Sequence, residues 1–303
     1  MTKISVVINT RNEEKNLPGC LTAVQKTVDE IVICDMESTD NTKKIAKEFN
    51  ARIFSHKNVN YVEPARNFAI DKAKGNWILL LDADEIIDQE LLQKLINFAE
   101  SKSYDFVRIP RKNIIFGKWI KYTGWWPDYQ IRFFRKSTVT WGDEIHSIPL
   151  TKGKGFDLPA EEKNALMHHI YQSTTQFIER LNRYTTAEAQ EIVKEEANFE
   201  WQNIIRKPSQ EFLSRFFMRE GYKDGVHGLI LSLLQAFSML TVQVKVWEMH
   251  KFPEVSSKNF LDLVAKEERK ERKDFVYWFF HKRAENASGL SRFIFKIRSR
   301  LHI

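Results

Sequence analysis

Short apolar segments alternate with segments of helical periodicity through the first hundred residues, and this alternation constrains the fold most strongly. The pattern predicts strands at 4–8, 31–34, 52–55, 77–81 and 104–110, separated by helices at 17–26, 41–49, 64–72 and 89–99. A repeat of this kind folds as a mostly parallel sheet with right-handed crossovers and flanking helices. We therefore expect an α/β domain with its binding groups beyond the carboxyl ends of the strands.

Segment 79–85, LLLDADE, ends an apolar strand in two carboxylates one residue apart. Because Asp82 and Asp84 alternate, both side chains can face one hard cation. A Mg²⁺ or Mn²⁺ ion held by one or two carboxylates usually completes its coordination with substrate phosphate oxygens. The segment thus predicts a metal-bound diphosphate. The alternative is that Asp84 or Asp88 only caps the helix that follows.

Composition narrows the classes of protein that the chain can belong to. Its 303 residues suffice for one large domain, or for one domain with an appendage. The two cysteines, Cys20 and Cys34, provide neither a disulfide framework nor a metal-binding cluster. The first strand begins almost at once, without a signal peptide, so we expect a cytoplasmic protein. Since no glycine-rich phosphate loop follows a predicted strand, dinucleotide and P-loop chemistry are disfavoured.

Four polar motifs accompany the predicted strands in a fixed order. They are TRNE at 10–13, DMESTDNT at 35–42, ARN at 65–67 and DAD at 82–84. Each motif alone is weakly specific, whereas the four in order are far more so. Their order resembles that of the family 2 glycosyltransferases, which have the GT-A fold, a Rossmann-like and mostly parallel sheet flanked by helices. The resemblance covers the first half of the chain.

The resemblance implies a site for a nucleotide sugar and a divalent cation. It assigns Thr10, Arg11 and Glu13 to the nucleotide pocket, Asp35 to the uracil edge, Arg66 to the diphosphate, Asp82 to the ribose and the metal, and Asp84 to the metal. From the residues alone, Asp35 has an alternative role in capping a helix beside Ser38. For Arg66 the alternative is a surface cation on a helix.

An aromatic, irregular segment occupies 112–150. Trp125 and Trp126, which stand beside a glycine and a proline, predict a platform for the apolar face of an acceptor or donor sugar. Asp128 predicts a carboxylate that accepts hydrogen bonds from sugar hydroxyls. The alternative for the large rings is ordinary packing in the core.

Segment 141–147, WGDEIHS, resembles the region in which the heptose- and lipopolysaccharide-modifying branch of the family carries Val-His-Glu. Here Ser147 replaces that glutamate. Inverting transfer needs a carboxylate that takes the proton of the acceptor hydroxyl, so Glu144 or Asp143 is the candidate base. For one of these two acids, a surface turn is the alternative.

A pair of histidines ends a short apolar run near residue 170. GT-A enzymes often place a histidine late in the core, so the resemblance implies a metal or phosphate contact for His168 or His169. Their alternation on a strand lets one of them face the site in either register. A hydrogen-bonded core histidine is the alternative.

The remainder of the chain has a helical pattern, so we divide it into a catalytic domain, 1–172, and a helical extension, 173–303. The apolar segment 228–244 barely reaches the length of a spanning helix, which favours a buried or interfacial helix. Segment 290–301 carries an apolar stripe and four cations, which favours contact with an anionic membrane surface. Packing within the chain or in a homodimer is the alternative. No nucleic-acid recognition motif accompanies the charge, so nucleic acid is not an expected partner.

Together these features predict an inverting, metal-dependent glycosyltransferase that uses a UDP-sugar donor, with UDP-glucose expected. The expected acceptor is a glycan or lipid-linked saccharide in cell-envelope lipopolysaccharide or polysaccharide biosynthesis, at the inner face of the plasma membrane. No QxxRW motif is present, which disfavours processive synthesis. Two alternatives stay open: transfer to a polyprenyl phosphate, and a noncatalytic module that binds a sugar nucleotide or a membrane.

Overall fold

The computed structural model describes residues 2–58, 63–101, 103–142, 149–195, 198–256 and 258–302. The chain divides into two compact units. The first consists of Met1–Ile114 with Pro127–Ile170, and the second of Ile115–Trp126 with Tyr171–Ile303. This division differs from the single boundary expected after residue 172, because the short segment Ile115–Trp126 joins the second unit.

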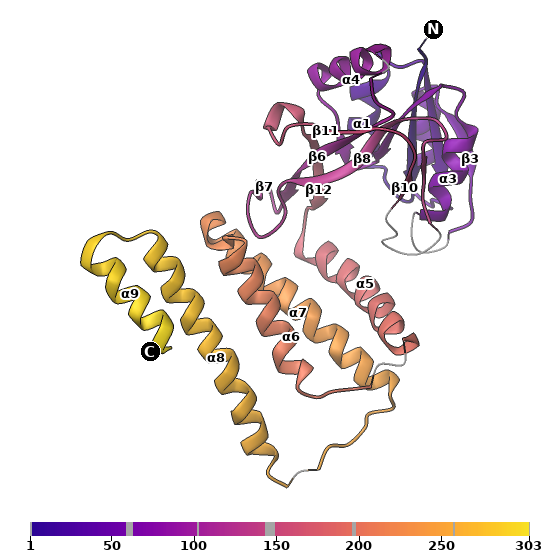
Figure 1. Ribbon diagram of the computed structural model, residues 1–303. Coiled ribbons are helices and arrows are strands. Elements are labelled where there is room, and N and C mark those ends of the chain that lie inside the picture. Colours follow the sequence, from indigo (N-terminus) through magenta and orange to yellow (C-terminus); the bar gives the residue numbers. More distant parts are fainter. Residues whose placement is uncertain are drawn as a thin grey trace. The chain divides into compact units, whose positions relative to one another are not determined.

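The first unit is built on a sheet flanked by α1, α3 and α4 (Figure 1). Its strand order is β3-β2-β1-β4-β8-β6-β12-β5. Its elements are β1 (Ile4–Thr10), α1 (Leu17–Val24), β2 (Glu30–Asp35), α2 (Thr42–Glu48), β3 (Arg52–Ser55), α3 (Glu63–Lys72), β4 (Trp77–Asp82), β5 (Glu85–Ile86), α4 (Gln89–Ser101), β6 (Phe106–Ile115), β8 (Asp128–Arg135), β9 (Val139–Thr140), β10 (Leu150–Thr151), β11 (Gly155–Asp157), η1 (Glu162–Asn164) and β12 (Leu166–Tyr171). Strands β3, β2, β1 and β4 run parallel, and β8 pairs antiparallel with β4. The predicted βα alternation is thus confirmed for the first four strands.

The strands of the parallel part send alternate side chains into two apolar layers. On one face Val6, Ile8 and Leu79 pack with residues of α1 and α4, and on the other Val7 and Ile78 pack with residues of α3. Each side chain buried in this way contributes about 1.5–3 kcal/mol relative to exposure. Because a one-residue slip would exchange the two layers, this core fixes the strand register and the points at which the strands end.

The second unit is largely helical. Its elements are β7 (Lys118–Trp119), α5 (Thr174–Lys194), α6 (Asn203–Leu213), η2 (Ser214–Met218), η3 (Gly221–Asp224), α7 (Val226–Met249), α8 (Phe260–Glu285) and α9 (Gly289–Leu301). Helix α7 packs with α5 and α6, and α8 forms a pair with α9 (Figure 1). Helix α5 begins after Ser173, whose hydroxyl accepts a hydrogen bond from the Gln176 N–H at 3.2 Å, as an N-cap residue does.

Buried Asp224 holds the segment Ile115–Trp126 in the second unit. Its carboxylate accepts a hydrogen bond from the Tyr122 N–H at 2.8 Å, and its backbone carbonyl accepts one from Lys118 Nζ at 2.8 Å. The Thr123 N–H donates to the Arg219 carbonyl at 3.0 Å. These bonds join residues that lie far apart in the sequence, and no periodic pattern signals them.

Helix α7 contains the apolar segment 228–244. Among the helices that the structure describes, it alone has the length and composition to cross a membrane, and a third of its most apolar part is buried. Val242 and Val246 pack with Ala189 of α5, whereas Leu233 and Phe237 are exposed. One face of α7 is therefore core, as expected for a helix packed within its own unit.

Candidate functional site

The carboxyl ends of β2, β1 and β4 lie next to one another at one edge of the sheet. In the parallel register Thr10 is level with Asp35, and Asn9 is level with Asp82. The structure therefore brings together Thr10, Asp35 and Asp82, three of the residues singled out from the sequence. This edge is where open α/β sheets bind their ligands.

Several polar atoms at this edge are buried and have no hydrogen-bond partner within the described part of the chain. They are both amide atoms of Asn9, the Thr10 hydroxyl and Asp35 Oδ1. The other Asp35 oxygen lies 3.0 Å from Lys43 Nζ and accepts a hydrogen bond from the Ser38 N–H at 3.2 Å. Because each unpaired buried polar atom costs about 1–3 kcal/mol, a ligand that pairs with them would bind favourably.

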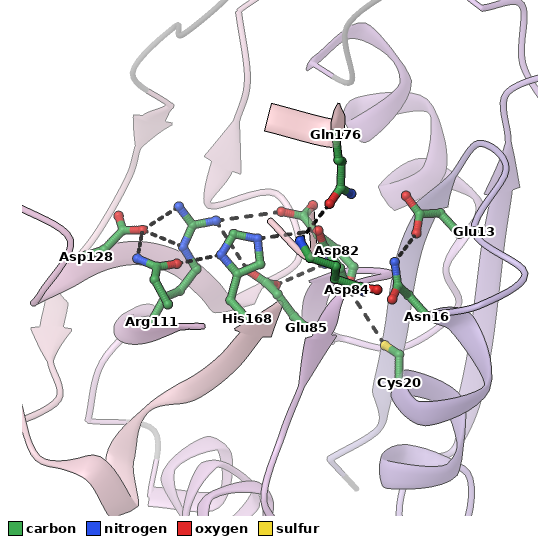
Figure 2. Close-up of polar contacts among 12 residues, drawn as sticks. Glu13, Asn16, Cys20, Asp82, Asp84, Glu85, Arg111, Asp128, His168 and Gln176 are labelled. Carbon is green, nitrogen blue, oxygen red and sulfur yellow. Dashed lines mark hydrogen bonds and ion pairs between the residues drawn. The ribbon is translucent and has the colours of Figure 1, made fainter. Parts of the chain in front are cut away.

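The loops after β1 and β2 are locked to each other. Asn12 Oδ1 accepts a hydrogen bond from the Thr39 N–H at 2.8 Å. The Glu13 carboxylate accepts one from Asn16 Nδ2 at 2.8 Å (Figure 2), while Arg11 is exposed in the same loop. The polar motifs that follow these strands thus shape the loops. Contact of Arg11 and Glu13 with a nucleotide stays a prediction.

Asp82 is surrounded by three arginines. Its Oδ1 lies 3.1 Å from Arg66 Nη2, and its Oδ2 pairs with Arg132 and lies 3.9 Å from Arg111 Nη1. Burial alone would raise the pKa of Asp82, but the charges of Arg132, Arg66 and Arg111 hold it well below its ordinary value. Asp82 is therefore ionised and paired. Its contacts with metal and ribose stay a prediction, and would be made alongside or in place of these arginines.

Glu85 and Arg132, which no sequence pattern singled out, form the buried base of this network. Arg132 is 1% exposed and lies 2.7 Å from Glu85, which is fully buried and accepts a hydrogen bond from the Asp82 N–H. Burial opposes the charged form of Arg132, but the charges of Asp82 and Glu85 raise its pKa. One feature of the sequence could have indicated this pair, because Arg132 stands between the apolar residues Ile131 and Phe133. A cation within an apolar strand is rarely buried unless it is paired with an acid.

A chain of hydrogen bonds leads from Asp128 through Asn113 to His168. The His168 ring faces Asp84 (Figure 2). Asn113 Nδ2 donates to Asp128 at 3.1 Å, so Asn113 Oδ1 faces His168 Nδ1 at 2.7 Å. His168 Nδ1 is then the donor, and whenever the ring is neutral its lone pair is on Nε2. Nε2 lies 3.5 Å from Asp84 Oδ2. A protonated ring therefore forms an ion pair with Asp84, whereas a neutral ring and Asp84 present two acceptors to a cation.

Asp84 and His168 fit two ligand positions of Mn²⁺ or Mg²⁺. Carboxylate oxygens suit both ions, and a hydrogen bond from the second ring nitrogen is typical of a metal-binding histidine. Nowhere in the described ranges do three or more His, Cys, Asp or Glu side chains gather as a metal site. The remaining ligands would therefore come from substrate and water, as is usual for these ions.

Three further carboxylates were predicted to act on the sugar or the acceptor. Asp128 accepts hydrogen bonds from Arg111 Nε at 2.8 Å and Gln130 Nε2 at 2.9 Å, in addition to that from the Asn113 amide. Burial raises the pKa of Asp128, but the Arg111 charge and these hydrogen bonds lower it below its ordinary value. Asp128 thus organises the site, and its contact with sugar hydroxyls stays a prediction. Asp143 and Glu144 lie outside the described residues.

The two tryptophans of the predicted sugar platform belong to the second unit. The Trp125 ring packs edge-on against Tyr171 at a centroid distance of 6.3 Å, and the Trp126 ring against Trp119 at 5.2 Å. Both rings therefore take part in aromatic packing, but both are half-buried and do not belong to the core, which was the alternative considered. Their role in sugar binding stays a prediction.

Replacing Asn113 tests the hydrogen-bond chain. Asn113 is fully buried, and leucine has a similar size without polar atoms, so Asn113→Leu leaves Asp128 and His168 each short of a partner. We expect unfolding in urea to show a loss of about 1–3 kcal/mol. Imidazole ¹⁵N NMR should also show that His168 no longer favours the Nδ1–H tautomer. Asn97→Leu, on an exposed face of α4, is the matched control, and an unchanged tautomer would contradict the assignment.

Comparison with known proteins identifies the family. The model described as glycosyl transferase family 2 matches residues 5–156. An uncharacterized glycosyltransferase of Rickettsia typhi is 27% identical over 259 residues, which cover 82% of this chain and 88% of that protein. The poly(ribitol-phosphate) beta-N-acetylglucosaminyltransferase TarS of Staphylococcus aureus is 30% identical over 124 residues, 38% of this chain and 22% of TarS. The crystal structure of S. aureus TarS 1–349 aligns with 84% of this chain and 93% of that chain, at 16% identity and a TM-score of 0.43.

The matched residues make up half of the chain and include the parallel strands, the polar loops that follow them and the acids after β4. The predicted fold class, a GT-A sheet followed by a helical extension, is thereby confirmed, and so is the predicted class of enzyme. The chain belongs to glycosyl transferase family 2.

Proposed function

We propose that the protein transfers a hexose, with glucose as the first candidate, from a UDP-sugar to a glycan or lipid-linked saccharide. The transfer inverts the anomeric carbon and depends on Mn²⁺ or Mg²⁺. The observation that carries this proposal is the set of buried, unpaired atoms of Thr10 and Asp35 at the same edge as Asp82. A nucleobase offers the donors and acceptors that such atoms lack.

Each group at the edge of the sheet has a part in the proposed reaction. The unpaired Asp35 oxygen accepts a hydrogen bond from uracil N3–H. Arg66 releases Asp82 and pairs with the diphosphate of the donor instead. Asp84 and His168 would hold the cation, which would supply positive charge to the departing diphosphate. The acceptor hydroxyl forms a bond to the anomeric carbon as the bond to the diphosphate breaks, and its proton passes to a carboxylate, for which Glu144 or Asp143 is the candidate.

The acceptor class is the least constrained part of the proposal. The relative TarS is named as a transferase of N-acetylglucosamine to poly(ribitol-phosphate), so a polymeric acceptor occurs among similar proteins. A glycan or lipid-linked saccharide of a lipopolysaccharide or other polysaccharide is the corresponding acceptor for this chain. We place the reaction in the cytoplasm, at the inner face of the plasma membrane.

Exchanging Asp35 for asparagine tests recognition of the base. Lys43 and the Ser38 N–H would attract the new amide oxygen, which leaves the amide NH₂ in the place of the unpaired carboxylate oxygen. Uracil presents a donor at N3 and cytosine an acceptor. We therefore expect Asp35→Asn to bind UDP about tenfold more weakly and to shift its preference toward CDP.

Calorimetric titration with UDP, CDP and GDP, with and without Mn²⁺, measures this shift. Asp71→Asn, a substitution of an exposed acid on α3, is the matched control and should bind like the wild type. Failure of the wild-type protein to bind UDP under any of these conditions would overturn the proposed donor. An Asp35→Asn variant with unchanged affinities would instead remove Asp35 from the base site.

A further inference from the structure

Helix α9 packs against α8 through the side opposite its apolar stripe. The Phe295 ring lies 6.0 Å from the Phe280 ring of α8, and Arg283 of α8 lies 4.4 Å from the centre of the Phe295 ring. Ser299, one turn after Phe295, is 5% exposed. Residues four apart share a helix face, so Phe295 and Ser299 mark the packed side of α9.

The apolar residues of α9 lie on a different face and are exposed. The stripe consists of Leu290, Phe293, Ile294, Ile297 and Leu301, with exposed fractions of 74, 61, 44, 40 and 59%. Their spacing of three or four residues places them in one continuous band along the helix. An amphipathic helix ordinarily turns such a band toward the core of its protein, and α9 turns it outward within its unit.

Positive charge flanks this stripe. Residues Gly289–Leu301 include four cations, Arg292, Lys296, Arg298 and Arg300, and no acidic residue. Successive helix positions are rotated by 100°, so Arg298 lies to one side of Ile297, and Arg300 lies to the opposite side of Leu301. Lys296 and Arg300 thus line one side of the stripe, whereas Arg298, on the other side, lies 4.4 Å from the centre of the Phe280 ring of α8. An apolar band with a row of cations along its edge matches the boundary between lipid chains and anionic headgroups.

We propose that α9 binds the surface of a membrane that contains anionic lipids, with the helix lying in the plane of the interface. Leu290, Phe293 and Ile297 would enter the acyl boundary, while Lys296 and Arg300 would contact lipid phosphates. A second α9 would bring cations against cations, and a nucleic acid would leave the apolar stripe exposed. This inference rests on the membrane location given in the proposed function and names the element that would make the contact. Its failure is distinguishable from that of the proposed donor site, because UDP binding is measured without vesicles.

Vesicle flotation of the full-length protein tests the proposal. We expect binding to vesicles of phosphatidylcholine with phosphatidylglycerol, and much weaker binding to phosphatidylcholine alone. Lys296→Gln with Arg300→Gln should weaken binding to the anionic vesicles about 30-fold, since each cation near such a surface contributes about a fivefold gain. Phe293→Ser with Ile297→Ser should weaken it about tenfold or more. High salt should reduce binding of the wild type.

Lys44→Gln with Lys47→Gln is the matched control, because it removes two exposed charges from α2 in the other unit. This variant should float like the wild type. Circular dichroism and calorimetric UDP binding verify that each variant is folded, independently of lipid binding.

Three results would overturn the proposal. The first is that the protein floats equally well with neutral and anionic vesicles, and that both α9 variants float like the wild type. This result would place the contact with the membrane outside α9. The second is a change of oligomeric state in the serine variant by light scattering without any change in flotation, which would assign the stripe to a second copy of the chain. The third is that the wild type binds duplex DNA and does not bind vesicles, and that only the glutamine variant loses the binding to DNA.

Discussion

Replacing Arg132 with methionine is expected to destabilise the first unit by about 3–5 kcal/mol at neutral pH. Arg132 is buried between Asp82 and Glu85, and Glu85 is itself fully buried. Methionine keeps an unbranched side chain of comparable length, so the main effect is the loss of charge rather than a cavity. Unfolding in urea, followed by circular dichroism, measures the difference.

The cost of Arg132→Met should shrink as the pH falls. In the wild type, the arginines lower the pKa of Asp82 below its value of about 3.9 in the unfolded chain. Such a group stabilises the fold above the unfolded pKa, and its contribution is lost as the pH falls through the folded value. In the variant, Asp82 loses the charge that lowers its pKa most and takes up a proton more readily, so acid removes that unpaired charge along with its cost.

Arg135→Met provides the matched control from the same strand. Arg135 lies 3.3 Å from Asp105 in a half-exposed ion pair, for which we expect a loss within about 1 kcal/mol. Equal losses for the two variants would show that the Arg132 network contributes nothing beyond a surface pair. A loss in Arg132→Met that is independent of pH would show that charge is not its cause.

The parallel half of the fold was predictable because its physical cause is local. Both faces of β1, β2 and β4 are covered, so each strand reads as a short apolar run, and helical segments separate the runs. The assignment of Ile115–Trp126 to the second unit was not predictable. It depends on hydrogen bonds to Asp224 that become possible only when distant parts of the chain have folded.

The same distinction applies to the candidate site. Thr10, Asp35 and Asp82 were found because parallel strands bring their carboxyl ends to one edge. Arg132 and Asn113 were missed because they come from β8 and β6, which join the sheet antiparallel, with a bulge between Val107 and Arg108. Their partners depend on a register that periodicity does not specify.

The structure also separates the roles of the acids that follow β4. Asp88 Oδ1 accepts a hydrogen bond from the Glu90 N–H at 2.8 Å, so Asp88 caps α4. Asp82 is paired with arginines, whereas Asp84 faces His168 Nε2. Helix capping, the alternative for these acids, therefore applies to Asp88. Among these acids, Asp84 is the one whose carboxylate could bind a cation together with His168.

Asp84→Asn is accordingly expected to lower hexose transfer by about 10²–10³-fold, the size of effect seen when one group that stabilises developing charge is removed. The amide keeps the shape of the carboxylate but loses the charge that attracts the cation, so binding of UDP should also lose its dependence on Mn²⁺. UDP release from UDP-glucose and calorimetric titration of UDP measure the two effects. The free energy of unfolding should change little, because Asp84 is not the helix cap.

Asp88→Asn is the control that distinguishes a metal ligand from a nearby acid. It lies four residues along the chain, is exposed, and can still cap α4 through its amide oxygen. We expect it to retain both transfer and Mn²⁺-dependent UDP binding. If Asp84→Asn keeps the Mn²⁺ dependence while losing transfer, the cation is held elsewhere and Asp84 acts on the sugar. If both variants match the wild type, the acids after β4 serve the fold alone, because neither charge then contributes to binding or to transfer.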